Sequence, residues 1–323
     1  MSLKRKGTDA IPPVTAQVLL VVGLILASFC NPAFPEDNTV YQDAAKSGAD
    51  EGHRSSRMAS YRGDKFQYYL NKGFEAYMQN DLEQAIENYS NAVKIKRSPI
   101  FLAYFNRGSA YLKKGDYNAA IDDFTKVLEL KPDLISAYLS RGNTWIVKGN
   151  TDKALEDFTL AIAADPTWAD AYVNRGTLWF KLGEFEMAWN DLAKSIQIQE
   201  NSPSCLVGAA HFLATCPDEK FRNGPLAVEL SRKAIQLTHG LKGMVKTPSS
   251  PEVMTYTHLA LAPQYDALAA GLAETGDFKG AVEAQTQAIS LLEAENAAHK
   301  IPEYTARLKS YEEKKPRREI PVK

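Results

Sequence analysis

One glycine recurs at a fixed spacing through the middle of the chain. Gly108, Gly142 and Gly176 lie 34 residues apart, and Gly73 precedes the first of them by 35 residues. The segments around them read YYLNKG, YFNRGSAY, YLSRGNTW and YVNRGTLW. A fixed period of this length is typical of repeat proteins, whose units stack and bury their apolar faces against one another. The period therefore predicts an extended surface built from repeats rather than a single catalytic pocket.

The period divides the central region into four repeats, at residues 66–100, 101–134, 135–168 and 169–202. With the glycine at position 8, positions 4, 8 and 11 share one face of a first helix, and positions 20, 24 and 27 share one face of a second. Small residues at 8 and 20 let the two helices approach closely. Positions 4, 8, 20 and 32 hold Tyr69, Gly73, Ala85, Tyr104, Gly108, Ala120, Pro132, Tyr138, Gly142, Ala154, Pro166, Tyr172, Gly176 and Ala188.

Two further positions predict local structure. Position 15 is glycine in three repeats, and a left-handed residue there would end the first helix; these glycines are Gly115, Gly149 and Gly183. Position 7 is arginine and position 23 is aspartate in the last three repeats. We expect each pair to join the two helices of its repeat, because pairing removes the cost of a partly buried charge. The pairs are Arg107 with Asp123, Arg141 with Asp157, and Arg175 with Asp191.

At these residues the chain resembles the tetratricopeptide repeat (TPR) family. The resemblance implies an all-α, right-handed superhelical solenoid of antiparallel helix pairs, with about six pairs and a capping helix. Beyond the four clear repeats we expect a divergent pair at 203–238, an insertion loop at 239–261, a TPR-like pair at 262–295, and a capping helix with a polar tail at 296–323. The last third resembles the C-terminal module of exported bacterial TPR proteins.

The N-terminal region has a different composition. Lys4, Arg5 and Lys6 precede an apolar run from Val18 to Cys30, a pattern typical of a signal peptide. Residues 1–30 are therefore expected to be a cleaved signal or an uncleaved anchor, with possible membrane attachment through residues 14–30. The run is short for a membrane span, which needs about 20 residues. Residues 31–64 are polar and lack a helical period, and are expected to form a flexible linker.

The TPR resemblance also implies a binding face. In that architecture the first helices line a concave inner wall, and asparagine at position 6 is similar to the asparagine ladder of the O-GlcNAc transferase TPR region. An asparagine amide can pair with the main chain of an extended peptide. The alternative is that asparagine is simply common at this position of the repeat. Candidate peptide-binding residues on this face are Asn71, Phe74, Phe105, Asn106, Leu139, Asn143, Ile146, Val173, Asn174 and Phe180.

No catalytic or metal-binding motif accompanies the repeats. Cys205, His211 and Cys216 fall on one expected helix, where the histidine points about 120° away from the first cysteine and cannot share a metal with it. The chain contains no GxSxG, HExxH or CxxC motif. Its net charge of −1 gives no basic footprint for nucleic acid. We therefore predict no enzyme activity and no cofactor, and read the basic run after residue 313 as a solvated end.

These observations favour a non-catalytic scaffold that binds an extended segment of a protein partner on the concave face of the solenoid. The alternative is a membrane-tethered assembly factor that organises a complex in the cell envelope. The N-terminal region predicts export in either case, with the protein periplasmic or secreted after cleavage, or anchored by its N-terminal segment.

Overall fold

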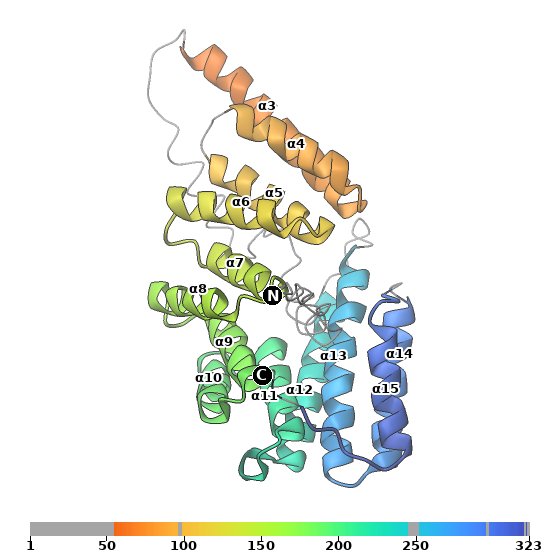
Figure 1. Cartoon of the computed structure of the whole chain (residues 1–323). Coiled ribbons are helices and arrows are strands. Elements are labelled where there is room, and N and C mark those ends of the chain that lie inside the picture. The colour runs from red at the N-terminus through yellow and green to blue at the C-terminus, as the bar shows by residue number, and fades with distance from the viewer. Residues whose placement is uncertain (1–54, 96–98, 245–251, 295–296, 320, 322–323) are drawn as a thin grey trace, which may run out of the picture.

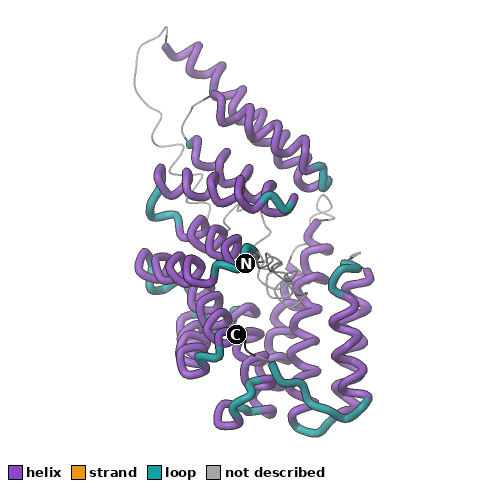
Figure 2. Tube along the Cα trace, viewed as in Figure 1, coloured by secondary structure: helices purple, strands orange, loops and turns teal. Residues whose placement is uncertain are grey.

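The computed structural model describes residues 55–95, 99–244, 252–294, 297–319 and 321. Within these residues it contains thirteen α-helices, one short 3-10 helix and no strand, joined by short loops (Figure 2). The predicted all-α helical repeat fold is therefore confirmed. The expected signal or anchor and most of the expected linker lie outside the described residues. Among the described helices, none combines the length and the apolar content needed to cross a bilayer.

The four repeats form consecutive antiparallel helix pairs (Figure 1). The first helix of each pair, here called the A helix, packs against the second, or B helix, and each B helix contacts the A helix that follows. The pairs are α3 (Ser55–Met78) with α4 (Leu82–Ile95), α5 (Ile100–Lys114) with α6 (Tyr117–Leu130), α7 (Ile135–Val147) with α8 (Thr151–Ala164), and α9 (Ala169–Leu182) with α10 (Phe185–Ile198).

The remaining helices complete the stack. They are α11 (Pro203–Thr215), the 3-10 helix η1 (Glu219–Phe221), α12 (Gly224–Met244), α13 (Glu252–Glu274), α14 (Phe278–Ala294) and α15 (Ile301–Glu312). Figure 1 shows α12 to α15 side by side, turned across the end of the stack. Helices α7 and α9 lie on the side of the stack nearer to α13, whereas α8 and α10 lie on the far side. The A helices therefore line the inner face of a curved molecule.

The turn within each pair depends on one left-handed residue. Gly115, Gly149 and Gly183 have φ angles of 91°, 74° and 84°, which confirms the prediction for position 15. In the first repeat Asn80 occupies this position with a φ of 61°; asparagine tolerates this region better than most residues with a side chain. In the first three repeats the next residue caps the B helix; for example, the Asp116 side chain accepts a hydrogen bond from the Ala119 N–H.

In the first three repeats, the core is a glycine on the A helix packed against an aromatic ring on the B helix, and in the fourth repeat Gly176 packs against Leu192. A Cβ atom added to Gly142 would lie 2.6 Å from Cε1 of Phe158, a ring that has no exposed surface. The same pairing recurs between Gly73 and Tyr89 and between Gly108 and Phe124. Burial of each such ring contributes about 1.5–3 kcal/mol. The glycines recur because any side chain at position 8 would push the two helices apart.

Two expected boundaries were wrong. The linker expected at 31–64 is helical from Ser55, because extending the helix of the first repeat costs little once that helix has formed. The loop expected at 239–261 is helical on both sides, since α12 continues to Met244 and α13 begins at Glu252. Only residues 245–251 of that segment lie outside the described residues. No proline or glycine interrupts the sequence between Glu252 and Leu261, and Pro263 is accommodated inside α13.

Candidate binding face on the A helices

Four of the predicted contact residues pack inside the helix stack instead of lining an open wall. Their side chains are at most 4 % exposed; they are Phe105, Leu139, Ile146 and Phe180. The rings of Phe105 and Phe124 are 5.6 Å apart, and those of Phe180 and Phe212 are 4.9 Å apart. These side chains fill the volume between successive helices, which must be packed densely. Their primary role is structural, so they offer little surface to a partner.

The other predicted residues differ in exposure. Phe74 and Val173 are half-buried, and Asn71 is exposed and accepts a hydrogen bond of 2.8 Å from Gln67. Asn106, Asn143 and Asn174 are 7 %, 1 % and 2 % exposed. Asn143 on α7 occupies position 9 of its repeat, and Asn174 on α9 occupies position 6. Residues three positions apart share one face of a helix, so the two amides occupy similar places on neighbouring A helices.

Three amide atoms of Asn143 and Asn174 are buried without hydrogen-bond partners. Neither Nδ2 nor Oδ1 of Asn143 is paired, nor is Nδ2 of Asn174. A buried polar atom without a partner costs about 1–3 kcal/mol, and most such atoms in folded proteins are paired. Asn143 and Asn174 thus carry hydrogen-bonding capacity that the helix stack itself does not use.

The three predicted Arg–Asp pairs are confirmed. Arg141 on α7 donates from Nε and Nη2 of its guanidinium to the two carboxylate oxygens of Asp157 on α8, over 3.0 and 2.7 Å. Burial raises the pKa of Asp157, and the guanidinium of Arg141 opposes that rise. Arg107 with Asp123 and Arg175 with Asp191 make the same two-pronged contact. Because these arginines are committed to their own repeats, they are not free to bind a ligand.

Each arginine also reaches the preceding repeat, which the sequence reading missed. NH1 of Arg141 donates over 3.1 Å to the Thr125 hydroxyl on α6. Ser90 and Thr159 accept in the same way from Arg107 and Arg175. The sequence does contain a signal for this contact, because a serine or threonine recurs at position 25 of the first three repeats. One arginine in each of the last three repeats therefore joins three helices and fixes the angle between successive pairs.

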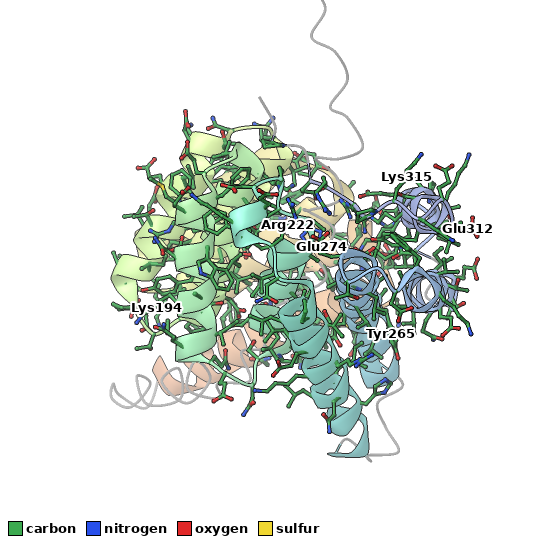
Figure 3. All side chains as sticks on the ribbon, turned by 90° about the horizontal axis from the view of Figure 1, so that it is seen from below. Lys194, Arg222, Tyr265, Glu274, Glu312 and Lys315 are labelled. Atoms are coloured by element: carbon green, nitrogen blue, oxygen red, sulfur yellow. The ribbon has the colours of Figure 1, made fainter. Side chains whose placement is uncertain are left out.

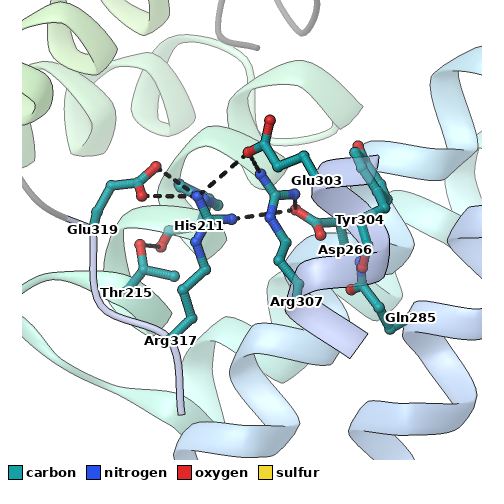
Figure 4. A network of polar contacts seen from close by, with 9 residues as sticks. All are labelled: His211, Thr215, Asp266, Gln285, Glu303, Tyr304, Arg307, Arg317 and Glu319. Carbon is teal, nitrogen blue, oxygen red and sulfur yellow. Dashed lines mark hydrogen bonds and ion pairs between the residues drawn. The ribbon is translucent and has the colours of Figure 1, made fainter. Parts of the chain in front are cut away.

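The inner face of the C-terminal half carries a network of charged groups (Figure 4). Its centre is Arg307 on α15, which is 5 % exposed and pairs with Asp266 on α13 and with Glu303. Asp266 is 2 % exposed, and its burial would raise its pKa, but Arg307 and Arg317 lower it below the ordinary value. Charges buried this deeply are stable only when paired, so the network holds α13 against α15.

His211 on α11 lies beside this network as a neutral ring. Burial lowers its pKa to about 4. The surrounding charges partly cancel, since Glu319 and Asp266 raise the pKa while Arg317 and Arg307 lower it. Cys205 and Cys216 are buried and free, and burial raises the pKa of both thiols. In the part of the chain that the structure describes, no group of three or more His, Cys, Asp or Glu side chains could hold a metal ion.

The basic segment after α15 is not the solvated end that the sequence predicted. Lys314 and Lys315 are exposed, but Arg317, Arg318 and Glu319 are half-buried against the inner face. Figure 3 shows Arg222 and Glu274 close to one another near this segment, where Arg222 donates to Glu274 over 3.0 Å. The prediction failed because the carboxylates that attract these arginines come from α13 and α15, and local sequence does not reveal that they converge.

Comparisons with known proteins agree with this architecture. Residues 101–134 match the sequence model of the tetratricopeptide repeat. The chain is 32% identical over 76 residues to the photosystem I assembly protein Ycf3 of Acaryochloris marina, covering 23% of this chain and 45% of that protein. It is 29% identical over 100 residues to the mitochondrial import receptor subunit TOM70 of Saccharomyces cerevisiae, covering 31% and 16%. The chain thus spans less than half the length of these curated relatives.

A solved structure shows the same fold over a longer stretch. One chain of the APC/C hetero-tetramer Cut9–Hcn1 aligns with a TM-score of 0.50 and 15% identity, covering 74% of this chain and 49% of that one. Helix pairs, repeat match and structural similarity together define a TPR-type helical solenoid. Proteins built in this way are typically scaffolds for protein–protein interaction. The inner face of the A helices is the surface on which the functional hypotheses below are based.

Proposed function

We propose that this chain is a non-catalytic scaffold that binds an extended segment of a partner protein along α7 and α9. The observation that supports this proposal most directly is the set of three unpaired amide atoms on Asn143 and Asn174. An asparagine amide offers both a donor and an acceptor, which match the carbonyl and N–H of a peptide main chain. Both side chains are at most 2 % exposed, so a partner would reach them only after the side chains that cover them move aside. Each new hydrogen bond would then also remove a cost already present in the free protein.

The spacing of the asparagines favours recognition of the partner's main chain over its side chains. Asn106 occupies position 6 on α5 and Asn174 the same position on α9, so an extended segment running along the A helices would meet amides at intervals of one or two repeats. Phe74 and Val173 are half-buried and can contact apolar side chains of that segment. Because the helices are already packed, the backbone of the wall is preorganised, and only side chains need to move on binding.

Selection of peptides from a random display library provides the test. The affinity of selected peptides is measured by fluorescence anisotropy for the full chain and for the Asn143→Ala/Asn174→Ala variant. We expect this variant to bind at least tenfold more weakly, which corresponds to about 1.4 kcal/mol. The matched control is Asn118→Ala/Asn190→Ala, which removes two exposed amides from α6 and α10 on the B helices. Equal losses in both variants, or no loss in either, would refute the role of the inner amides.

We also propose that the protein is exported and acts in the cell envelope, either free or tethered by residues 14–30. The basic residues before the apolar run support export. A tethered form would suit an assembly factor, the role stated in the name of the photosystem I relative. N-terminal sequencing of the protein purified from its native cells distinguishes the two forms. A product that begins shortly after residue 30 indicates a cleaved signal, an intact leader in the membrane fraction indicates the tether, and an intact leader in the cytosol contradicts export.

A further inference from the structure

After α15 the chain turns back and crosses the inner face. The N–H groups of Lys314 and Lys315 donate to the carbonyls of Tyr311 and Ser310, and Lys314 takes a φ of 55°, which reverses the direction of the chain. The residues that follow, Pro316–Glu319 with Pro321, are here called the return segment. Figure 1 shows it running from the end of α15 toward α9 and α11. It contains no helix, and its contacts reach α13, α15, α11 and the turn after α9.

The basic half of the return segment faces carboxylates of α13 and α15. The guanidinium of Arg317 lies 3.9 Å from Glu303 and 4.0 Å from Asp266, and it holds both carboxylate oxygens of Glu319 at 2.9 and 2.8 Å (Figure 4). NH1 of Arg318 lies 2.7 Å from Oε2 of Glu274, at the end of α13. Three acidic side chains of α13 and α15 therefore receive two consecutive arginines.

The acidic half of the segment reaches α11 and α9. The N–H of Glu319 donates over 2.9 Å to the carbonyl of Thr215, at the end of α11. The carboxylate of Glu319 also interacts electrostatically with Lys181 on α9. Burial lowers the pKa of Lys181 to about 8, and the negative charge of Glu319 opposes this by raising it. Pro321 then covers the turn after α9, where a Cβ atom added to Gly183 would lie 3.3 Å from Cβ of Pro321. One main-chain hydrogen bond and a set of charge pairs thus fix the segment.

These contacts hold the segment without building it into the core. The side chains of Arg317, Arg318 and Glu319 remain 16%, 34% and 22% exposed, whereas core side chains of the repeats have no exposed surface. A stretch held mainly by polar contacts, with few buried apolar ones, opens at low free energy compared with the core. The segment can therefore leave while the helices beneath it stay packed, because Arg307 remains to pair with Asp266 and Glu303.

We propose that the return segment is an exchangeable internal ligand, and that the surface beneath it binds an extended partner segment with an arginine two residues before a glutamate. The partner's arginine would replace Arg317 among the carboxylates, and its glutamate would replace Glu319 at α9 and α11. The internal segment excludes weak competitors, because a tethered ligand acts at an effective concentration in the millimolar range. The inference shares only the inner face with the proposed function, and it uses the C-terminal half rather than the amides of α7 and α9.

A competition in trans tests the proposal without any outside partner. A fluorescent peptide with the sequence of residues 313–323 is titrated into a variant that ends at Glu313 and into the full chain. We expect micromolar binding to the shortened variant and at least tenfold weaker binding to the full chain. A control peptide in which the residues at 317 and 319 are exchanged should bind the shortened variant at least tenfold more weakly. Glu303→Gln in the shortened variant should also weaken binding of the first peptide.

Circular dichroism decides whether the shortened variant is informative. If it loses helix, the full-length Arg317→Ala/Glu319→Ala variant replaces it, since that change loosens the segment without removing it. Failure of the folded variant to bind the peptide would overturn the proposal, as would equal binding of both peptides or equal binding by the shortened and full chains. Asn143→Ala/Asn174→Ala should leave this titration unchanged. The proposed function and this inference can therefore fail separately.

Discussion

Removal of Asp157 should destabilise the protein far more than removal of a surface charge. The carboxylate is 3% exposed and Arg141 is 18% exposed, and two short hydrogen bonds join them. Breaking a buried ion pair by deleting one partner costs about 3–5 kcal/mol. Because Arg141 retains some contact with water and keeps its bond to Thr125, we expect the lower end, about 3 kcal/mol, for Asp157→Ala.

A double-mutant cycle separates the pair from its surroundings. Urea unfolding, followed by circular dichroism, is measured for the native chain, Asp157→Ala, Arg141→Ala and the double variant. We expect a coupling free energy of about 2 kcal/mol between the two side chains, within the range for contacting residues. The control cycle uses Lys126 and Glu129, an ion pair three residues apart on α6 that is 47% and 58% exposed, and it should give a much smaller coupling because solvent screens exposed charges. A coupling no larger than the control would refute the structural role of the buried pair.

Three further changes test the local arguments. Gly142→Ala should lower the free energy of unfolding by about 1–3 kcal/mol because its Cβ meets Phe158, and Gly142→Ala/Phe158→Leu should recover part of that loss in the same urea assay. Asn80→Ala should cost about 1 kcal/mol because of the positive φ, whereas Asn80→Gly should not; equal effects would contradict this reading. Between pH 6.5 and 4 the unfolded chain binds a proton at His211 that the folded chain excludes. Native stability should therefore fall by up to about 3 kcal/mol over that interval as the pH drops, and His211→Gln should remove this part of the loss.

Local patterns predicted the features that recur in every repeat. The left-handed turns, the close approach at Gly142 and the Arg–Asp pairs all follow from the 34-residue period, because equivalent positions meet equivalent neighbours. The 34-residue period did not predict which side chains of the binding face are exposed. Periodicity showed that Leu139 and Phe180 lie on A helices, but their burial depends on how far each helix pair rotates against the next, and that rotation is set by side-chain packing across the whole layer.

The sequence by itself determined the repeat, the pairing of helices within it and the residues that must be small, because these depend on contacts between positions less than one period apart. Only the tertiary structure revealed the return segment and its site. Arg317 meets Asp266 and Glu303 because the chain after α15 turns back across α13, which packs against α11, and such a meeting leaves no periodic trace in the chain. Whether two distant segments form a charge pair depends on the packing angles of all the helices between them. Local composition and spacing do not determine those angles.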